Sequence, residues 1–269
     1  MRGFYVYCIR YGADKKNIKT KGIEFGGKIS AIPFKDIEAI VSDINLSQFN
    51  EKKIEDKLQG DPKWTEKNIR RHHDVIAKVY EMSTVIPMKF GMIFKTKRSL
   101  EVMLKKYYRK FKRLFIGLAG KQEWGVKIYL EYEKFVEFLK KENEEVKKLE
   151  EKKSAMSEGA QWYTDKKIDK LVTEKSEEEI EKQLQCIAKR LEDCCEQTAL
   201  CNLLPKEVTT EINKDNIFNT ACLIDNSKLD YFKKMLQETQ KECDQIGATL
   251  VATGPWPPYN FVNIKNERI

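Results

Sequence analysis

The sequence has few of the residues from which catalytic and metal sites are built. It contains only two His, at positions 72 and 73, in 269 residues. A metal site would need a further His or Cys about one helical turn along, and Lys78 to Tyr80 provide none. The sequence also lacks a P-loop and a G-x-G-x-x-G turn after a predicted strand. It therefore predicts no catalytic residue, no metal and no cofactor, as expected for a protein that is not an enzyme.

The cysteine pattern and the absence of long hydrophobic runs argue against the secreted and membrane classes. The seven Cys are irregularly spaced, Cys194 and Cys195 are adjacent, and no C-x-x-C pair exists. This pattern favours free thiols in a reducing cytoplasm over a disulfide framework or a zinc site. The N-terminal MRGFYVYCIRYG lacks the features of a secretory signal, and no window is apolar enough to span a bilayer. We expect a cytoplasmic protein without membrane contact.

Charge, by contrast, is abundant. Charged residues make up 34% of the chain and hydrophobic residues 41%, which is polar for a globular protein but sufficient for a core. The surplus charge must lie on long solvated helix faces. The formal net charge of +8 permits nucleic acid or an acidic surface as a partner and requires neither.

A short apolar run, TVIPMKFGMIF from Thr84 to Phe94, lies between charged, helix-like segments. Its first residues favour an extended backbone, Pro87 reinforces that preference, and Gly91 permits a bend. In an extended segment Met88, Phe90 and Met92 alternate onto one face, with Lys89 on the other. This face either fills the core between helix and sheet or binds a partner, and the sequence leaves both alternatives open.

The first half of the chain predicts a small α+β domain, residues 1–130. Its predicted strands are Phe4–Arg10, Lys28–Pro33, Ile37–Asp43 and Val126–Leu130, and its predicted helices are Thr65–Met82 and Lys97–Leu118. Residues 45–64 are polar and mixed, which predicts a loop with a helical turn. The helix from Lys97 has a clean apolar stripe opposite a basic face.

The second half, residues 131–269, begins with a change in composition. Residues 131–153 are almost entirely Glu and Lys with apolar residues at heptad spacing, and residues 178–202 repeat the pattern. They predict an antiparallel helical hairpin over 131–202, with two ordinary surface helices as the alternative. Residues 203–269 form a further α+β unit, with strands at Val208–Ile212, Phe218–Ile224 and Thr249–Thr253 around a helix that ends near Ile246. The fold class is α+β, with two ferredoxin-like domains and the hairpin in the second.

Several of these segments carry a family resemblance. The run HHDVIAKVYEMSTVIPMKFGMIF (72–94) and the ending GPWPPYNFV (255–263) resemble the gas vesicle protein F/L family, GvpF/GvpL. The residues that carry the motif are His72, Pro87, Gly91, Trp124, Trp256, Pro257, Pro258 and Tyr259. The resemblance implies a two-domain α+β protein with a helical hairpin. It also implies a non-enzymatic accessory or minor structural protein of gas vesicle assembly, which binds the small, very apolar major shell protein, with other accessory proteins as further candidate partners.

The N-terminal half is the predicted binding half, because an apolar client needs apolar contact area with a polar rim. The candidate partner-binding residues are Phe4, Tyr5, Tyr7, Met88, Lys89, Phe90 and Met92. The alternative function is an RNA-binding module that uses the aromatic first strand and the basic face from Lys105 to Arg113. The GPWPPYNFV tail is predicted to be structural: its prolines end the closing strand, and Trp256, Tyr259 and Phe261 pack the tail onto the protein.

Overall fold

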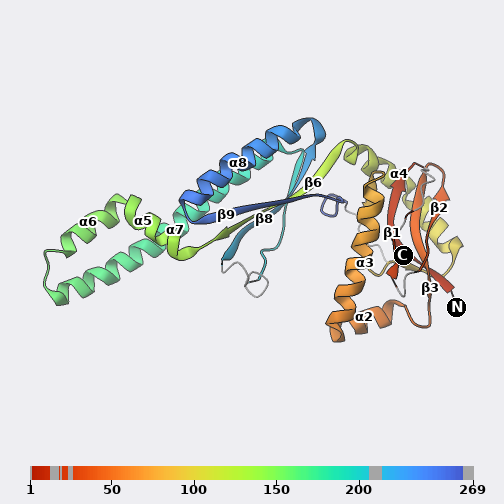
Figure 1. The fold of residues 1–269 in the computed structure, drawn as a ribbon, viewed down its shortest axis with the longest axis horizontal. Coiled ribbons are helices and arrows are strands. Elements are labelled where there is room, and N and C mark those ends of the chain that lie inside the picture. The colour runs from red at the N-terminus through yellow and green to blue at the C-terminus, as the bar shows by residue number, and fades with distance from the viewer. Residues whose placement is uncertain (1, 13–17, 19, 24–26, 206–213, 263–269) are drawn as a thin grey trace. The chain divides into compact units, whose positions relative to one another are not determined.

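The structure is a computed structural model that describes residues 2–12, 18, 20–23, 27–205 and 214–262 (Figure 1). The chain divides into two compact units. Unit 1 comprises the residues up to Gln122 together with those from Pro255 onward, and unit 2 comprises Glu123–Gly254. Each unit has its own sheet, so the predicted α+β class with two α+β domains is confirmed.

The sheet of unit 1 has the strand order of a ferredoxin-like domain. The strands are β1 (Arg2–Tyr11), β2 (Ile29–Phe34), β3 (Ile37–Asn45), β4 (Val85–Pro87) and β5 (Ile93–Phe94). Their order is β2-β3-β1-β4, all neighbours are antiparallel, and β5 also pairs with β1. Every residue of β1 from Tyr5 to Arg10 is buried, as expected for a central strand that is covered on both faces.

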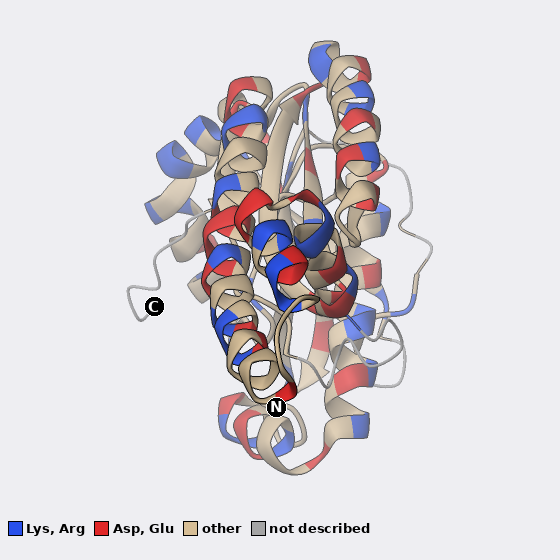
Figure 2. Cartoon of the chain, turned by 90° about the vertical axis from the view of Figure 1, so that its left-hand side faces the viewer, with Lys and Arg blue, Asp and Glu red and all other residues tan. Residues whose placement is uncertain are grey.

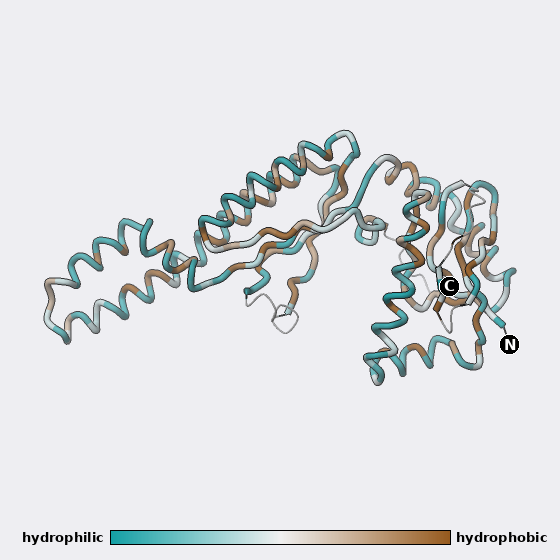
Figure 3. Tube along the Cα trace, in the orientation of Figure 1, coloured by the Kyte–Doolittle hydropathy of each residue, from teal (hydrophilic) through white to brown (hydrophobic). Residues whose placement is uncertain are grey.

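Three described helices belong to unit 1: α2 (Glu51–Gly60), α3 (Pro62–Tyr80) and α4 (Lys97–Leu118). The side chain of Asp61 accepts a hydrogen bond from the Trp64 N–H, and Pro62 occupies the first turn of α3, which is a standard helix start. Val75, Ile76 and Val79 of α3 pack into one core with the aromatic residues of β1. In Figure 3 hydrophobic residues recur along α3 and along the strands of this sheet.

Unit 2 repeats the same strand order with different helices. Its strands are β6 (Lys121–Leu130), β7 (Gln197–Leu200), β8 (Asp215–Asp225) and β9 (Ala248–Trp256), in the order β7-β8-β6-β9. Its helices are α5 (Tyr132–Glu142), α6 (Glu144–Lys153), α7 (Glu158–Cys194) and α8 (Leu229–Gln245), with a short 3-10 turn, η2 (Asn226–Lys228), before α8.

The helical hairpin occupies the connection between the first two strands of unit 2. Helices α5 and α6 form one arm and α7, with 37 residues or about 56 Å, forms the other. Val146, Ile168 and Val172 make a small apolar cluster between the arms. Asn143 separates α5 from α6 and caps α6 through its side chain. Basic and acidic residues are interspersed along the helices in Figure 2, as the Glu/Lys composition predicts.

The structure differs from the sequence prediction at several boundaries. The division falls at 122/123 rather than 130/131, because β6 pairs within the sheet of unit 2, and the residues from Pro255 return to unit 1. The hairpin ends at Cys194 rather than at 202, because Gln197–Leu200 pairs with β8. The predicted loop at 45–64 contains α2, which buries only Ile54 and so shows no apolar stripe. The predicted strand at 208–212 lies outside the described residues.

Candidate partner-binding groove

His72 is the centre of a buried hydrogen-bond chain in unit 1. Its Nε2 lies 3.1 Å from the Met88 carbonyl oxygen, and its Nδ1 lies 2.8 Å from the Tyr5 hydroxyl. Because a carbonyl oxygen only accepts, Nε2 carries the proton, and the Tyr5 hydroxyl donates to Nδ1. The Gly91 N–H in turn donates to the Tyr5 oxygen at 3.1 Å. This chain fastens the segment 88–91 to β1 and α3.

The hydrogen-bonded groups around His72 are uncharged at physiological pH. Burial lowers the pKa of His72 to about 4, and the hydrogen bond to Met88 offsets this only in part. Burial also raises the pKa of the Tyr5 hydroxyl. A neutral imidazole that donates at one nitrogen and accepts at the other fits this geometry, so the arrangement positions the 88–91 segment and carries no charge.

The segment after Met88 forms a tight turn. The Met92 N–H donates to the Lys89 carbonyl at 3.3 Å, and Gly91 has a φ of 87°, which favours glycine. The predicted alternation of Met88, Phe90 and Met92 on one extended face is therefore wrong. Met88 is buried and continues β4 by donating its N–H to the Tyr7 carbonyl at 2.9 Å, whereas Phe90 and Met92 are half-buried.

The short strand β5 has an open outer edge. The Val6 N–H donates to the Met92 carbonyl at 2.9 Å, and Ile93 stands opposite Tyr5. In an antiparallel pair of strands, residues that bond to the partner strand alternate with residues whose N–H and C=O point away from it. Met92 bonds to β1, so the N–H and C=O of Ile93 point away from β1. No described residue bonds to either group. On β4 the outward positions are Pro87, which has no N–H to offer, and Val85, which is fully buried, so among these described positions only Ile93 of β5 combines an outward N–H with exposed surface.

A surface groove of about 970 Å³ runs beside this edge. It lies between the start of α2 and the turn, and Leu46, Phe90, Met92 and Ile93 supply its apolar lining. Three lysines, Lys52, Lys89 and Lys95, and one acid, Glu51, also line the groove. An apolar lining with cationic groups around it is suited to contact with an apolar segment of another protein.

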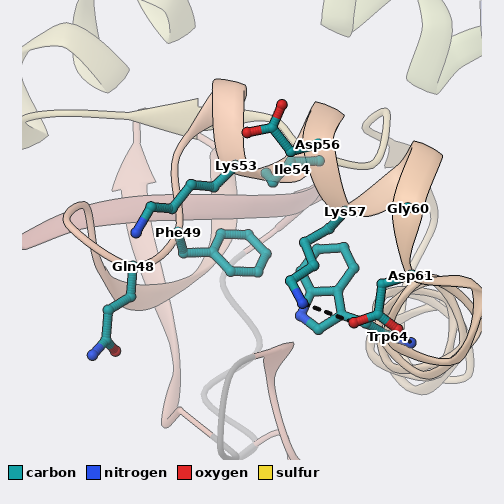
Figure 4. A pocket seen from close by; sticks show the side chains of 9 residues that line it. All are labelled: Gln48, Phe49, Lys53, Ile54, Asp56, Lys57, Gly60, Asp61 and Trp64. Carbon is teal, nitrogen blue, oxygen red and sulfur yellow. Dashed lines mark hydrogen bonds and ion pairs between the residues drawn. The ribbon is translucent and has the colours of Figure 1, made fainter.

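A second hollow of about 500 Å³ is lined by residues of α2 and by Trp64 of α3 (Figure 4). Phe49, Ile54 and Trp64 supply its apolar lining, and Lys57 at its edge bonds to Asp61 at 2.7 Å. The two aromatic rings lie 5.7 Å apart and belong to the cluster that extends to Tyr5 and Phe90. Residues of helix α2 therefore line both hollows, next to aromatic side chains of the core.

The structure places the predicted binding residues in different environments, and Met88 is buried, as described above. Tyr5 and Tyr7 have no exposed surface, because their rings fill the core and their hydroxyls bond to His72 and Ser42. Phe4 is half-buried on β1. Lys89, Phe90 and Met92 line the groove. The aromatic first strand is therefore not a docking surface, and it cannot supply the stacking platform that the RNA-binding alternative requires.

The remaining motif residues lie elsewhere. Trp124 is in unit 2, with its ring 6.0 Å from that of Phe232. At the end of β9, Pro257 and Pro258 directly follow the last strand residue and are buried, whereas Trp256 and Tyr259 are about 40% exposed.

The tail contacts α3 through a residue that the sequence reasoning left without a role. The Tyr259 hydroxyl lies 2.7 Å from Nδ1 of His73, and the rings of Trp256 and Tyr259 each lie 5.7 Å from that imidazole. The adjacent histidines therefore serve two contacts, one with the core and one with the tail. The sequence could have indicated a separate role for His73, because consecutive residues on a helix point about 100° apart and two adjacent histidines therefore face different neighbours.

Two further observations concern the described part of the chain alone. Its His, Cys, Asp and Glu side chains form no group of three that could hold a metal ion. None of its helices combines the length and the apolar character that a membrane crossing needs.

Comparisons with known proteins agree with one another. The family model described as gas vesicle synthesis protein GvpL/GvpF matches residues 3–263. Gas vesicle protein F1 of Halobacterium salinarum is 25% identical over 97% of this chain and 92% of its own length. Gas vesicle protein L of a Streptomyces species is 21% identical over 87% of this chain and 83% of its own. The crystal structure of GvpF from an Anabaena species superposes with a TM-score of 0.71 at 16% identity and covers 98% of both chains.

Proposed function

The chain belongs to the GvpL/GvpF family of gas vesicle proteins, which act in gas vesicle formation and not as enzymes, and we propose that it binds the major gas vesicle shell protein in the groove beside β5. The observation that carries the proposal is the combination of an apolar lining with an unpaired strand edge at Ile93. A small, very apolar shell subunit, as the family resemblance implies, needs cover for its apolar surface until it enters the shell.

The geometry supports binding by strand addition. An extended segment of the partner would pair its backbone with the outward N–H and C=O of Ile93, as peptides do at exposed sheet edges. Alternate side chains of that segment would then meet Phe90 and Met92. The lysines around the groove would contact acidic or polar groups at the ends of the bound segment, which favours one register over others.

The turn is pre-organised for this role. The His72 chain and the left-handed Gly91 hold residues 88–91 in one conformation before any partner binds. Pre-organisation lowers the entropy lost on binding, so that a small contact area supports a useful affinity. The buried motif residues therefore contribute to binding indirectly, by fixing the groove, whereas the half-buried residues of the groove make the contact.

The test is a single charge placed in the groove. Met92→Asp should weaken binding of the purified shell protein by roughly tenfold or more, because a carboxylate would be desolvated against an apolar partner. The matched control is Ile69→Asp, which puts the same charge at an exposed apolar position of α3 outside the groove. Melting curves should show both variants folded, whereas Met88→Asp should destabilise unit 1, because Met88 is only 4% exposed.

Two outcomes would contradict the proposal. One is unchanged binding by a folded Met92→Asp variant, which would move the binding surface away from the groove. The other is an equal loss of binding in the Met92→Asp and Ile69→Asp variants, which would show a general response to added negative charge.

A further inference from the structure

Helix α4 carries almost all of the net charge of the chain. Its sequence has one acid, Glu101, and eight cations: Lys97, Arg98, Lys105, Lys106, Arg109, Lys110, Lys112 and Arg113. Seven positive charges thus remain on one helix, against a formal net charge of +8 for all 269 residues. Such a concentration of charge attracts acidic partners over a distance of about 10 Å at moderate salt.

The cations are arranged around a hollow of about 440 Å³ where α4 meets the β2–β3 turn. Four cations line it, Lys35, Lys105, Lys106 and Arg109, together with the rings of Phe34 and Tyr108. No carboxylate is among these described lining residues. Lys105 and Arg109 have no acidic partner within 4 Å among the described residues, so their charges are available to a ligand.

Asp36, which follows Lys35 in the sequence, already has two hydrogen-bond partners. Both oxygens of Asp36 are used, one by the Tyr108 hydroxyl at 2.7 Å and the other by the ammonium of Lys112 at 2.5 Å. These bonds, that of Lys112 first, lower the pKa of Asp36, so it stays ionised, and its charge is paired with Lys112, which is not among the cations that line the hollow. The backbone of Lys35 has a φ of 55°, which is rare for a residue other than glycine. Its ammonium group lies 4.3 Å from the centre of the Tyr108 ring.

The exposed face of α4 extends beyond the hollow in both directions. Val102, Lys105, Arg109, Arg113 and Ile116 recur at intervals of three and four residues and share one side of the helix. Val102 is 59% exposed and Ile116 is 72% exposed. The stripe has apolar ends about 21 Å apart and a basic centre, which is the complement of a helix with apolar ends and an acidic centre.

We propose that this stripe is a second docking surface, which binds an acidic amphipathic helix of a partner protein. The partner's carboxylates lie over Lys105 and Arg109, and its apolar residues contact Val102 and Ile116. A protein helix fits better than nucleic acid, because base stacking needs open aromatic faces. Here Phe34 and Tyr108 pack against each other with ring centres 5.9 Å apart, and Lys35 covers Tyr108. The proposal is independent of the groove.

The test uses a synthetic, fluorescein-labelled helical peptide of about 18 residues with Glu in its centre and Leu near its ends. Anisotropy titration with the full chain at about 0.15 M salt should show saturable binding. Lys105→Glu combined with Arg109→Glu should weaken it by roughly tenfold or more. Val102→Ser with Ile116→Ser should weaken it by roughly fivefold. The control is Lys148→Glu with Lys152→Glu, which reverses two exposed charges four residues apart on α6.

Four outcomes would overturn the proposal. The control variant could lose as much affinity as the α4 variant, which would indicate attraction by net charge alone. A scrambled peptide of the same composition could bind as tightly, which would exclude a helical partner. A single-stranded RNA of equal charge could bind more tightly than the peptide, which would assign the face to nucleic acid. No saturation by the peptide would exclude the surface altogether. Unchanged melting curves establish that each variant is folded.

Discussion

Mild acid should weaken unit 1, and His72 should be the cause. The unfolded chain protonates this imidazole near pH 6.5, whereas in the folded protein burial lowers its pKa to about 4. Between these two values the unfolded state binds more protons than the folded state. Stability is therefore complete above pH 6.5, falls as the pH drops towards 4, and changes no further through this group below that.

The expected size follows from the difference between the two pKa values. At pH 5.5 the contribution of His72 is about 1.4 kcal/mol of lost stability, and near pH 4 it approaches about 3 kcal/mol. The structural cause is the burial of the imidazole. Protonation of Nδ1 would remove the acceptor for the Tyr5 hydroxyl and would place a charge in a core that offers it no carboxylate among its described residues.

The comparison is between the wild type and His72→Gln, which does not titrate. At pH 7 the variant should be less stable by about 1–3 kcal/mol, because Tyr5 and Met88 lose a buried partner. At pH 4.5 the two proteins should have nearly equal stability, because the wild type has lost the contribution of His72. The second histidine, His73, is present in both proteins and therefore cancels in the comparison.

Urea unfolding with pulsed hydrogen exchange provides the assay, read on peptides from α3 and, as an internal control, on peptides from α8. Both histidines lie in unit 1, so α8 peptides should show no slope of this origin. A pH slope in α3 that survives His72→Gln would refute the reasoning. So would a wild-type α3 stability that is flat between pH 6.5 and 4.5.

Three further predictions rest on stability. Tyr5→Phe should lower the free energy of unfolding by about 2–4 kcal/mol, because it leaves the Gly91 N–H and a nitrogen of His72 without their partner. Tyr11→Phe, at a residue that is 45% exposed, should lower it by less than about 0.5 kcal/mol. Urea titration of both variants checks this. Gly91→Ala should lower the melting temperature through a strain of about 1–2 kcal/mol, whereas Gly117→Ala in helix α4 should raise it slightly. Termination after Gly254 should lower the melting temperature of unit 1 but leave that of unit 2, and equal shifts would contradict the tail's assignment to unit 1.

The sequence predicted elements best where an apolar period runs through them. The bounds of α4, Lys97–Leu118, agree with the predicted helix to the residue, because its apolar stripe is continuous over the whole length. Helix α2 was missed because its single buried side chain produces no period. Strand β7 was read as a continuation of the hairpin, since its four residues are mostly exposed and pair only with β8, which is distant in sequence.

The site was harder to predict than the fold. The sequence showed that the residues after Pro87 matter, but not that Gly91 reverses the chain there and moves Met88 into the core and Met92 to the surface. A tight turn of this kind, closed by the bond from the Met92 N–H to the Lys89 carbonyl, changes which side chains share a face, and alternation along the sequence cannot reveal it. The hydrogen bond between Tyr5 and His72 joins residues 67 positions apart, and only the folded arrangement shows it.

Amide hydrogen exchange of the full chain, with and without the purified shell protein, is the most direct measurement of the proposed binding mode. Strand addition predicts that residues 89–96 become protected, with the largest change at the Ile93 amide, which no described residue bonds in the free protein. Peptides from α8 should stay unchanged. Protection by the shell protein elsewhere in the chain, with residues 89–96 unaffected, would contradict the account.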